Sequence, residues 1–311
     1  MNLSLSPDTP SLLLAMQEGG ASIIELGIPY SDPQADGATI QHTNEVAIKG
    51  GTTTIKQCLA MLKQAREEMG LTVPVVLMGY YNPFFQYGDA DRLCRDAKEA
   101  GADGFILVDL PPEEGTEFNQ ACAKHGLSNV PLVAPATSDK RIAALSDMTS
   151  TFMYCVSVAG VTGARDSLPP DLDKFIERVR SNTDLPLAVG FGISNPKMVH
   201  GVANIADGVV VGSEISKTVD KLGDDATTEE RARAVRDITS HLVSGIKQRY
   251  GAKNQATKLS QVPKIWEKDE IKSKTTRYGQ KWGGQFIPEC LSITSSLRFD
   301  FILLPYLGNL T

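Results

Sequence analysis

Short apolar runs alternate with amphipathic segments along most of the chain. The apolar runs are nearly continuous, which is typical of parallel strands covered on both faces. They predict strands at 22–26, 74–80, 103–109, 130–134, 151–158, 185–190 and 207–212. The segments between them predict helices at 53–68, 89–99, 113–125, 138–146, 171–180 and 195–203, with further helices from 214 to about 248. This alternation indicates successive βα units.

A helix is also predicted before the first strand. Ser6 and Pro7 have the form of an N-cap followed by proline at the first helical position, and Gly19-Gly20 ends the segment. A closed (β/α)₈ barrel has eight strands, and the pattern predicts seven. We therefore expect an α/β TIM barrel that lacks its first strand, unless residues 1–6 supply a short one. The strand at 22–26 would then be an exposed edge. An open, doubly wound sheet of seven strands fits the alternation equally well.

The pattern changes from about residue 249. Residues 249–281 hold nine Lys or Arg and three acidic residues with little periodicity, which is typical of a solvated linker. Residues 277–291 are aromatic and glycine-rich, and 292–311 are an apolar tail without an evident partner. The expected organisation is a barrel over 1–248, a basic linker over 249–276 and a poorly structured C-terminal extension.

Composition narrows the class of protein. A net charge of -6 and an isoelectric point near 5.4 argue against nucleic acid or an anionic membrane as the partner. Five scattered cysteines without paired spacing fit reduced thiols in a cytoplasmic protein. The first ten residues lack the basic region of a signal peptide, and no segment approaches the ~18 apolar residues of a membrane span.

An acidic residue closes the first apolar run, in the segment IELGIPYSDPQADG (24–37). In a barrel the carboxyl ends of the strands carry the active site. Glu25 shares a strand face with Ile23, so an inward-facing Glu25 would lie at the barrel mouth. Partial burial would raise its pKa and suit it to proton transfer. The alternative is a structural ion pair with Lys or Arg.

Three aspartates near strand ends are weaker candidates. Asp36 lies in a loop that can fold back over the mouth, or else it caps the segment that begins at Ala38. Asp32, between Ser31 and Pro33, is interpreted as a turn former. Asp109 either reaches the mouth or caps a helix that starts near Glu113.

Glycine-rich loops follow the last three predicted strands, at 159–165, 189–194 and 210–215. In a barrel without its first strand, these are the loops after strands six, seven and eight, where phosphate sites of this fold tend to form. Gly163, Gly192 and Gly212 would let backbone N–H groups approach an anion, and Ser213 adds a hydroxyl. The spacing is not that of a nucleotide-binding loop, so a small phosphorylated substrate is expected.

Aromatic residues lie at or just past strand ends: Tyr80, Tyr81, Phe84, Phe85 and Tyr154. Core packing is their ordinary role, but an apolar slot beside a phosphate site would suit a flat aromatic substrate. The four histidines fall on helices or helix ends without shared spacing, so no metal site is expected.

Several motifs resemble the tryptophan synthase α subunit in order and spacing across roughly residues 5–248. They are IELGIPYSDPQADGATIQ, VLMGYYNPFFQYG, LVDLPPEE, YCVSVAGVTGAR, GFGIS and DGVVVGSEI. The resemblance implies a (β/α)₈ barrel and the retro-aldol cleavage of indole-3-glycerol phosphate into indole and glyceraldehyde 3-phosphate. No cofactor is implied for this reaction.

The same resemblance assigns roles to individual residues. Glu25 is expected to protonate the indole ring at C3, and Asp36 to hydrogen-bond the indole N–H. Tyr154 would lie near the reacting end and Thr162 on a mobile loop that helps close the site. The phosphate loops would be those of Gly163, Gly192, Gly212 and Ser213, and Tyr80 is taken as a further substrate-binding residue.

Residues 277–291 are similar to the opening of a tryptophan synthase β subunit, which follows a linker in fused forms of the enzyme. The resemblance therefore implies a β domain or subunit as partner, with pyridoxal phosphate bound in that domain and not in this chain. Two other functions remain open. One is another phosphate-binding barrel, such as a sugar-phosphate isomerase. The other is a non-catalytic module that only binds a β-type partner.

Overall fold

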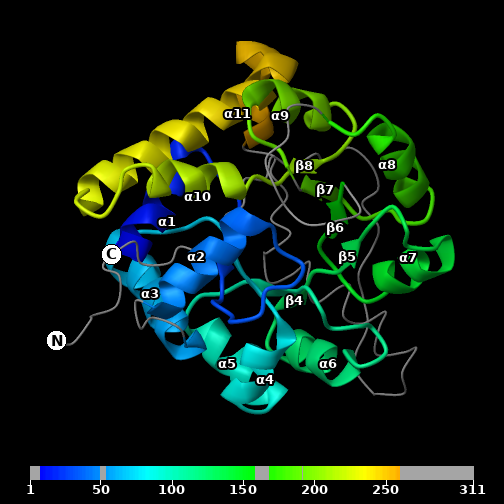
Figure 1. Cartoon of the computed structure of the whole chain (residues 1–311). Helices are drawn as coiled ribbons and strands as arrows, with labels where there is room; N and C mark the ends of the chain where they lie inside the picture. The colour runs from blue at the N-terminus through cyan, green and yellow to red at the C-terminus, as the bar shows by residue number, and fades with distance from the viewer. Residues whose placement is uncertain (1–7, 50–53, 158–167, 191, 260–311) are drawn as a thin grey trace.

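The computed structural model describes residues 8–49, 54–157, 168–190 and 192–259 (Figure 1). Its strands are β1 (Ile24–Gly27), β2 (Val75–Gly79), β3 (Gly104–Leu107), β4 (Ser128–Asn129), β5 (Leu132–Val133), β6 (Met153–Val156), β7 (Leu187–Gly190) and β8 (Gly208–Val209). Its helices are α1 (Asp8–Gly19), α2 (Ala38–Lys49), α3 (Ile55–Met69), α4 (Tyr81–Tyr87), α5 (Ala90–Glu99), α6 (Thr116–Lys124), α7 (Asp139–Ser146), α8 (Leu172–Arg180), α9 (Pro196–Ala203), α10 (Ser213–Asp220) and α11 (Thr228–Leu259).

All strand pairs are parallel, in two sheets of order β1-β2-β3-β4 and β5-β6-β7-β8. The break between the sheets falls inside the single strand that was predicted at 130–134. The Val130 N–H bonds to Phe105 of β3, whereas the Pro131 carbonyl accepts from Tyr154 of β6. The hydrogen bonds to β3 thus end at Val130, and those to β6 begin at Pro131. Thus β4 and β5 occupy one barrel position, and the described residues fill seven positions, as predicted.

Strand side chains separate two hydrophobic layers. The inner layer comes from every strand position or its flanks and contains Ile23, Val76, Met78, Ile106, Val130, Phe152, Tyr154, Ala188 and Val210. The outer layer joins the alternate strand residues to the helices. An open doubly wound sheet would instead place helices against both faces. The fold is therefore an α/β barrel of the TIM type.

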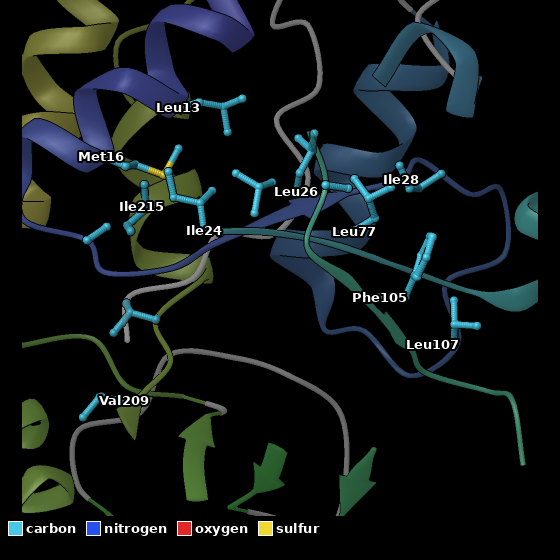
Figure 2. Packing of buried hydrophobic residues seen from close by; sticks show 14 of the residues in the cluster. Leu13, Met16, Ile24, Leu26, Ile28, Leu77, Phe105, Leu107, Val209 and Ile215 are labelled. Atoms are coloured by element: carbon cyan, nitrogen blue, oxygen red, sulfur yellow. The ribbon is translucent and has the colours of Figure 1, made fainter. Parts of the chain in front are cut away.

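The prediction that the strand at 22–26 is an exposed edge is wrong. Within the described residues no ladder joins β1 to β8, so β1 is an edge in hydrogen bonding. All four of its residues are nevertheless buried. Figure 2 shows Leu13 and Met16 of α1 and Ile215 of α10 gathered beside Ile24 in one cluster. Helix packing covers this edge.

Helices α1 and α11 pack against each other although they are far apart in sequence (Figure 1). Asp8 accepts from Arg231 at 2.6 Å, and both side chains are nearly buried. A Cβ on Gly19 would lie 2.6 Å from the Thr239 Cβ, so glycine allows the close crossing. Helix α11 ends at Leu259, which corrects the predicted helix end near 248. Residues 249–259 of the expected linker are helical, since Ala, Lys and Gln have high helix propensity.

Two helices were not predicted, and both lie next to the candidate site. The buried face of α2 includes the polar Thr43 and Asn44 beside Ile40 and Ala47, which hides its apolar stripe. Helix α4 has only seven residues and carries Pro83 in its first turn, where proline is tolerated. Among the described helices, none is both long and apolar enough to cross a membrane. The expected extension at 277–311 lies outside the described residues.

Candidate active site

Glu25 lies on β1 and faces the barrel interior, which is the orientation that its proposed role requires. Its neighbours Ile24 and Leu26 belong to the outer layer, so alternation directs Glu25 inward, where it pairs in register with the inner-layer Val76. Only 2% of Glu25 is exposed, and its Oε1 atom has no hydrogen-bond partner in the part of the chain that the structure describes. Among the described residues no Lys or Arg pairs with it, which argues against a structural ion pair.

The pKa of Glu25 is raised well above its usual range. The main cause is desolvation, because burial disfavours the charged carboxylate. The negative charge of Asp36 raises this pKa further. The structure thus brings together the two acids that the sequence analysis selected.

Asp36 is held in the loop between β1 and α2. Its N–H donates to the Pro33 carbonyl at 3.1 Å, and its own carbonyl accepts from the Gln41 side chain at 2.8 Å. Its Oδ2 accepts from the Tyr80 hydroxyl at 2.9 Å. Burial raises the pKa of Asp36 to about 6, while the Tyr80 hydrogen bond acts to lower it. The Asp36 carboxylate is therefore hydrogen-bonded to the residue that follows β2, although Asp36 itself lies in the loop before α2.

Tyr80 connects the loop to the barrel. Its hydroxyl donates to Asp36 and accepts from the Ala35 N–H at 2.8 Å. Its ring packs on Tyr30 with centroids 5.1 Å apart. The side chain is 4% exposed, so these contacts hold it firmly. Substrate binding by Tyr80 stays a prediction, and orienting Asp36 is an additional task that the geometry assigns.

Tyr154 approaches the two acids from β6, on the far side of the barrel. Burial raises the pKa of its phenol, and the charges of Glu25 and Asp36 raise it further. A Cβ on Gly190 would lie 2.3 Å from the Tyr154 Oη atom. Glycine at the end of β7 therefore provides the space for the tyrosine ring.

The glycine loops are partly described. Gly192 has φ +79°, a left-handed conformation that favours glycine, and it follows β7. Gly212 is the N-cap of α10 after β8, and Ser213 is the first residue of that helix. Since β7 and β8 are neighbours, both loops lie at the same end of the barrel. Thr162 and Gly163 lie outside the described residues.

The chain matches a known protein family over most of its length. The family model described as "Tryptophan synthase alpha chain" matches residues 6–246. The chain belongs to this family. A protein named "Tryptophan synthase" from Saccharomyces cerevisiae is 44% identical over 294 residues, which cover 91% of this chain and 40% of that protein. The chain therefore spans about 40% of the length of its yeast relative.

Solved structures agree with this membership of the tryptophan synthase alpha chain family. The alpha subunit from Legionella pneumophila superimposes with a TM-score of 0.69 at 36% identity, covering 77% of this chain and 87% of that subunit. A chain in the tryptophan synthase complex from Pyrococcus furiosus gives a TM-score of 0.67 at 34% identity, with 76% and 92% covered. Membership supports a role in tryptophan biosynthesis.

Other residues weighed for this alpha-type site have structural positions. Asp32 is exposed, and its carbonyl accepts from Gln34 in a turn, as interpreted from the sequence. Phe84 is fully buried against Phe105, whereas Phe85 is 64% exposed. Asp109 neither caps a helix near Glu113 nor contacts the two acids. Its Oδ1 accepts from the Tyr81 N–H at 2.6 Å, at the start of α4.

Three contributors to the site were missed from the sequence: Tyr30, Asn44 and Gly190. Asn44 on α2 accepts from the Tyr30 N–H at 2.9 Å and so fixes the ring that packs on Tyr80. Asn44 interrupts the apolar face of α2 with a polar group, a signal that could have identified it. The space required at Gly190 has no signal in the sequence.

The four histidines lie on helices or a helix end, as predicted. In the described part of the chain no three His, Cys, Asp or Glu side chains gather as metal ligands.

Proposed function

We propose that the chain cleaves indole-3-glycerol phosphate to indole and glyceraldehyde 3-phosphate. The observation that carries the proposal is the burial of two acids, Glu25 and Asp36, close enough for the charge of one to act on the other. Glu25 has its pKa raised well above the usual range, and Asp36 titrates at about 6. In the proposed reaction the acid with the strongly raised pKa, Glu25, serves as the proton donor, and Asp36 serves as the anion. Two acids whose environments separate their pKa values are the usual basis of acid–base assignments.

Glu25 acts first in the proposed reaction. Its protonated carboxyl gives a proton to C3 of the indole ring, which converts the ring to an indolenine. The bond between C3 and the glycerol side chain then breaks, and its electrons return to the ring. The hydroxyl on the departing carbon loses its proton to Glu25 and becomes the aldehyde. The Oε1 atom supports this role, because no group among the described residues forms a hydrogen bond with it.

Asp36 acts on the indole nitrogen. Protonation at C3 places positive charge on the ring N–H, and an ionised carboxylate beside it stabilises that charge. The carboxylate needs a fixed orientation, which the 2.9 Å bond from Tyr80 supports.

The second half of the barrel is proposed to hold the phosphate. The left-handed Gly192 and the turn from Gly212 to Ser213 present backbone at the mouth of neighbouring strands. Thr162 and Gly163 keep their predicted roles in loop closure and phosphate binding. Tyr154 would lie against the reacting end of the substrate.

No cofactor or metal is proposed for this step. The indolenine itself accepts the electrons of the breaking bond, so the chemistry needs proton transfer alone. Pyridoxal phosphate is assigned to a β domain, which we propose as the partner of this chain. The yeast match covers 91% of the chain and so extends beyond the 6–246 of the family model. This supports a fused origin, with residues 249–276 in or near a linker and 277–291 at the start of a β domain.

We propose a cytoplasmic location because the described cysteines are free thiols. Cys58, Cys94, Cys122 and Cys155 are all free and buried in the described chain. Reduced cysteines are the rule in a reducing compartment.

The deciding experiment incubates the purified full chain with indole-3-glycerol phosphate, alone and with an added tryptophan synthase β subunit. We expect indole and glyceraldehyde 3-phosphate in equal amounts. Binding of the β subunit without any indole would instead identify a non-catalytic module. Conversion of a different sugar phosphate with no cleavage would favour an isomerase, which the family match does not support.

A further inference from the structure

Asp109 connects one βα unit of the barrel to the next. It follows β3, and its Oδ1 accepts from the Tyr81 N–H at 2.6 Å. Tyr81 is the first residue of α4, and Tyr80, the N-cap of that helix, provides no side-chain cap. The first N–H groups of a helix have no partner within the helix. Asp109 therefore supplies, from the neighbouring strand, the acceptor that Tyr80 does not.

A second bond from the same segment lies on the other side of Tyr80. The Val108 N–H donates to the Gly79 carbonyl at 3.0 Å. Residues 108 and 109 thus hold the backbone on both sides of Tyr80. The Tyr80 hydroxyl in turn contacts Asp36 and Ala35. Asp109 is thus linked to the Asp36 carboxylate by two hydrogen bonds, one at the Tyr81 N–H and one at the Tyr80 hydroxyl, which the covalent chain between Tyr81 and Tyr80 joins.

We propose that Asp109 is a positioning residue, which keeps the Tyr80 hydroxyl on Asp36 by fixing the start of α4. The proposal rests on the function proposed above, in which Asp36 must be ionised and oriented. Asp109 does not touch the substrate in this scheme.

The charges around Asp36 explain why this contact matters. Glu25 on β1, Tyr80 after β2 and Tyr154 on β6 are the titratable groups that interact with Asp36. Burial favours the neutral form of Asp36, and the hydroxyl of Tyr80 is the group that opposes this effect. If α4 shifts, the Tyr80 bond lengthens and Asp36 holds its proton to higher pH.

Two pairs of variants separate the hydrogen bond from other effects. Asp109→Ala removes the acceptor, while Asp109→Asn keeps an oxygen that can accept from Tyr81. Tyr81→Pro removes the donor, while Tyr81→Ala keeps it and removes only the ring. Proline suits the first helical position, and Tyr80, at φ −89° and ψ 149°, already has the backbone that precedes proline. Glu113→Ala, on the same loop, controls for general loosening; its side chain pairs with Arg141 on the surface.

The first measurement is the titration of the Asp36 carboxyl by carbon-13 NMR in the full chain, with Asp36→Asn to assign the signal. In Asp109→Ala and Tyr81→Pro we expect the midpoint to rise by about half a pH unit or more, by the same amount in both. Asp109→Asn, Tyr81→Ala and Glu113→Ala should titrate like the wild type. An unchanged midpoint in the two disrupting variants, or an Asn variant that behaves like Ala, would overturn the proposal.

The second measurement is the dependence of kcat/KM on pH. For Asp109→Ala we expect a loss of about twofold or more near pH 6, because a half-unit rise from a pKa of about 6 halves the ionised fraction of Asp36 there. The loss should shrink above pH 8, where Asp36 is ionised in both proteins. A loss that is equal at every pH would show a purely structural role and contradict the proposal. If the wild-type chain cleaves no substrate, the proposed function fails, while the NMR titration still decides whether Asp109 positions Asp36.

Discussion

The two sheets of the barrel contribute to the candidate site in opposite ways. The sheet of β1–β4 contributes side chains, namely Glu25 and the residues that hold Asp36. The sheet of β5–β8 and its loops contribute mainly glycines, at positions 190, 192 and 212, where the lack of a side chain leaves space beside the backbone. In the proposed function the first sheet sets where protons are bound. The second sheet leaves the space for the Tyr154 ring and, in the same proposal, for the phosphate.

This difference teaches how each half tolerates change. In the first sheet a substitution alters charge or a hydrogen bond, so its effect should depend on pH. In the second sheet a substitution adds volume or strain, so its effect should be independent of pH. The following variants test that distinction.

The largest effect is expected for Glu25→Gln. Glutamine fills the same volume but cannot give a proton to C3. We expect kcat to fall by about 10²–10⁴-fold with little change in KM. Indole release under saturating substrate measures this. A variant that retains more than a tenth of the rate would remove Glu25 from the mechanism.

Gly190→Ala should come next. The new Cβ would lie 2.3 Å from the Tyr154 Oη and 2.7 Å from its Cζ, so the ring must move. A displacement of this size at the reacting end should lower kcat/KM by roughly 10²-fold at all pH values. Gly201→Ala on α9 is the control, because its Cβ meets only the flexible Leu168 Cδ1 at 2.8 Å. Similar losses in both variants would argue against a role for the space at Gly190.

Gly192→Ala tests the proposed phosphate loop. Its φ of +79° costs a non-glycine residue about 1–2 kcal/mol, and the strained loop should raise KM roughly tenfold. Gly70→Ala is a matched control at the C-cap of α3, with φ +78° and no atom within 4 Å of the new Cβ. Both variants should lose similar stability in denaturant titrations. A rise in KM in both would mean that lowered stability, and not the loop, is responsible.

Tyr80→Phe tests the first sheet through pH. The wild-type rate should fall below pH 6, because Asp36 has a pKa of about 6 and must be ionised. Removing the hydroxyl removes the contact that lowers this pKa, so the acidic limb should move to higher pH. The control is Tyr87→Phe, since Tyr87 donates to Asp96 at 2.9 Å away from the site. An acidic limb that stays in place would contradict the role of Tyr80.

The smallest effect concerns stability. The pKa of Glu25 is raised in the folded chain, so its carboxyl binds its proton more tightly there than in the unfolded chain. Stability from this source is fully present below the unfolded pKa and is lost as pH rises through the folded pKa. Glu25→Gln lacks this dependence. In urea titrations, the free energy of unfolding of the variant should therefore increase relative to that of the wild type as pH rises from 5 toward the folded pKa. A constant difference would indicate that Glu25 is not strained by burial.

Much of the architecture follows from the sequence alone. The apolar runs located every barrel position, because a strand covered on both faces must be apolar throughout. The same rule made Glu25 conspicuous, as an acid at the end of an apolar run. The turn formed at Asp32 and the family motifs were also readable. Helices α2 and α4 were not predicted. Helix α2 buries the polar side chains of Thr43 and Asn44, and α4 has only seven residues.

The tertiary structure decided the remaining features, since they depend on residues distant in sequence. Burial and the nearby Asp36 set the pKa of Glu25, and neither is a local property. The Tyr80 hydroxyl meets Asp36 across 44 positions of the chain, and Asp109 caps a helix that precedes it. Gly190 matters only because Tyr154 comes from another strand. The sequence determined which chemical groups the chain carries and where its strands lie. The packing of those strands into a barrel decided which groups are buried, protonated and held together.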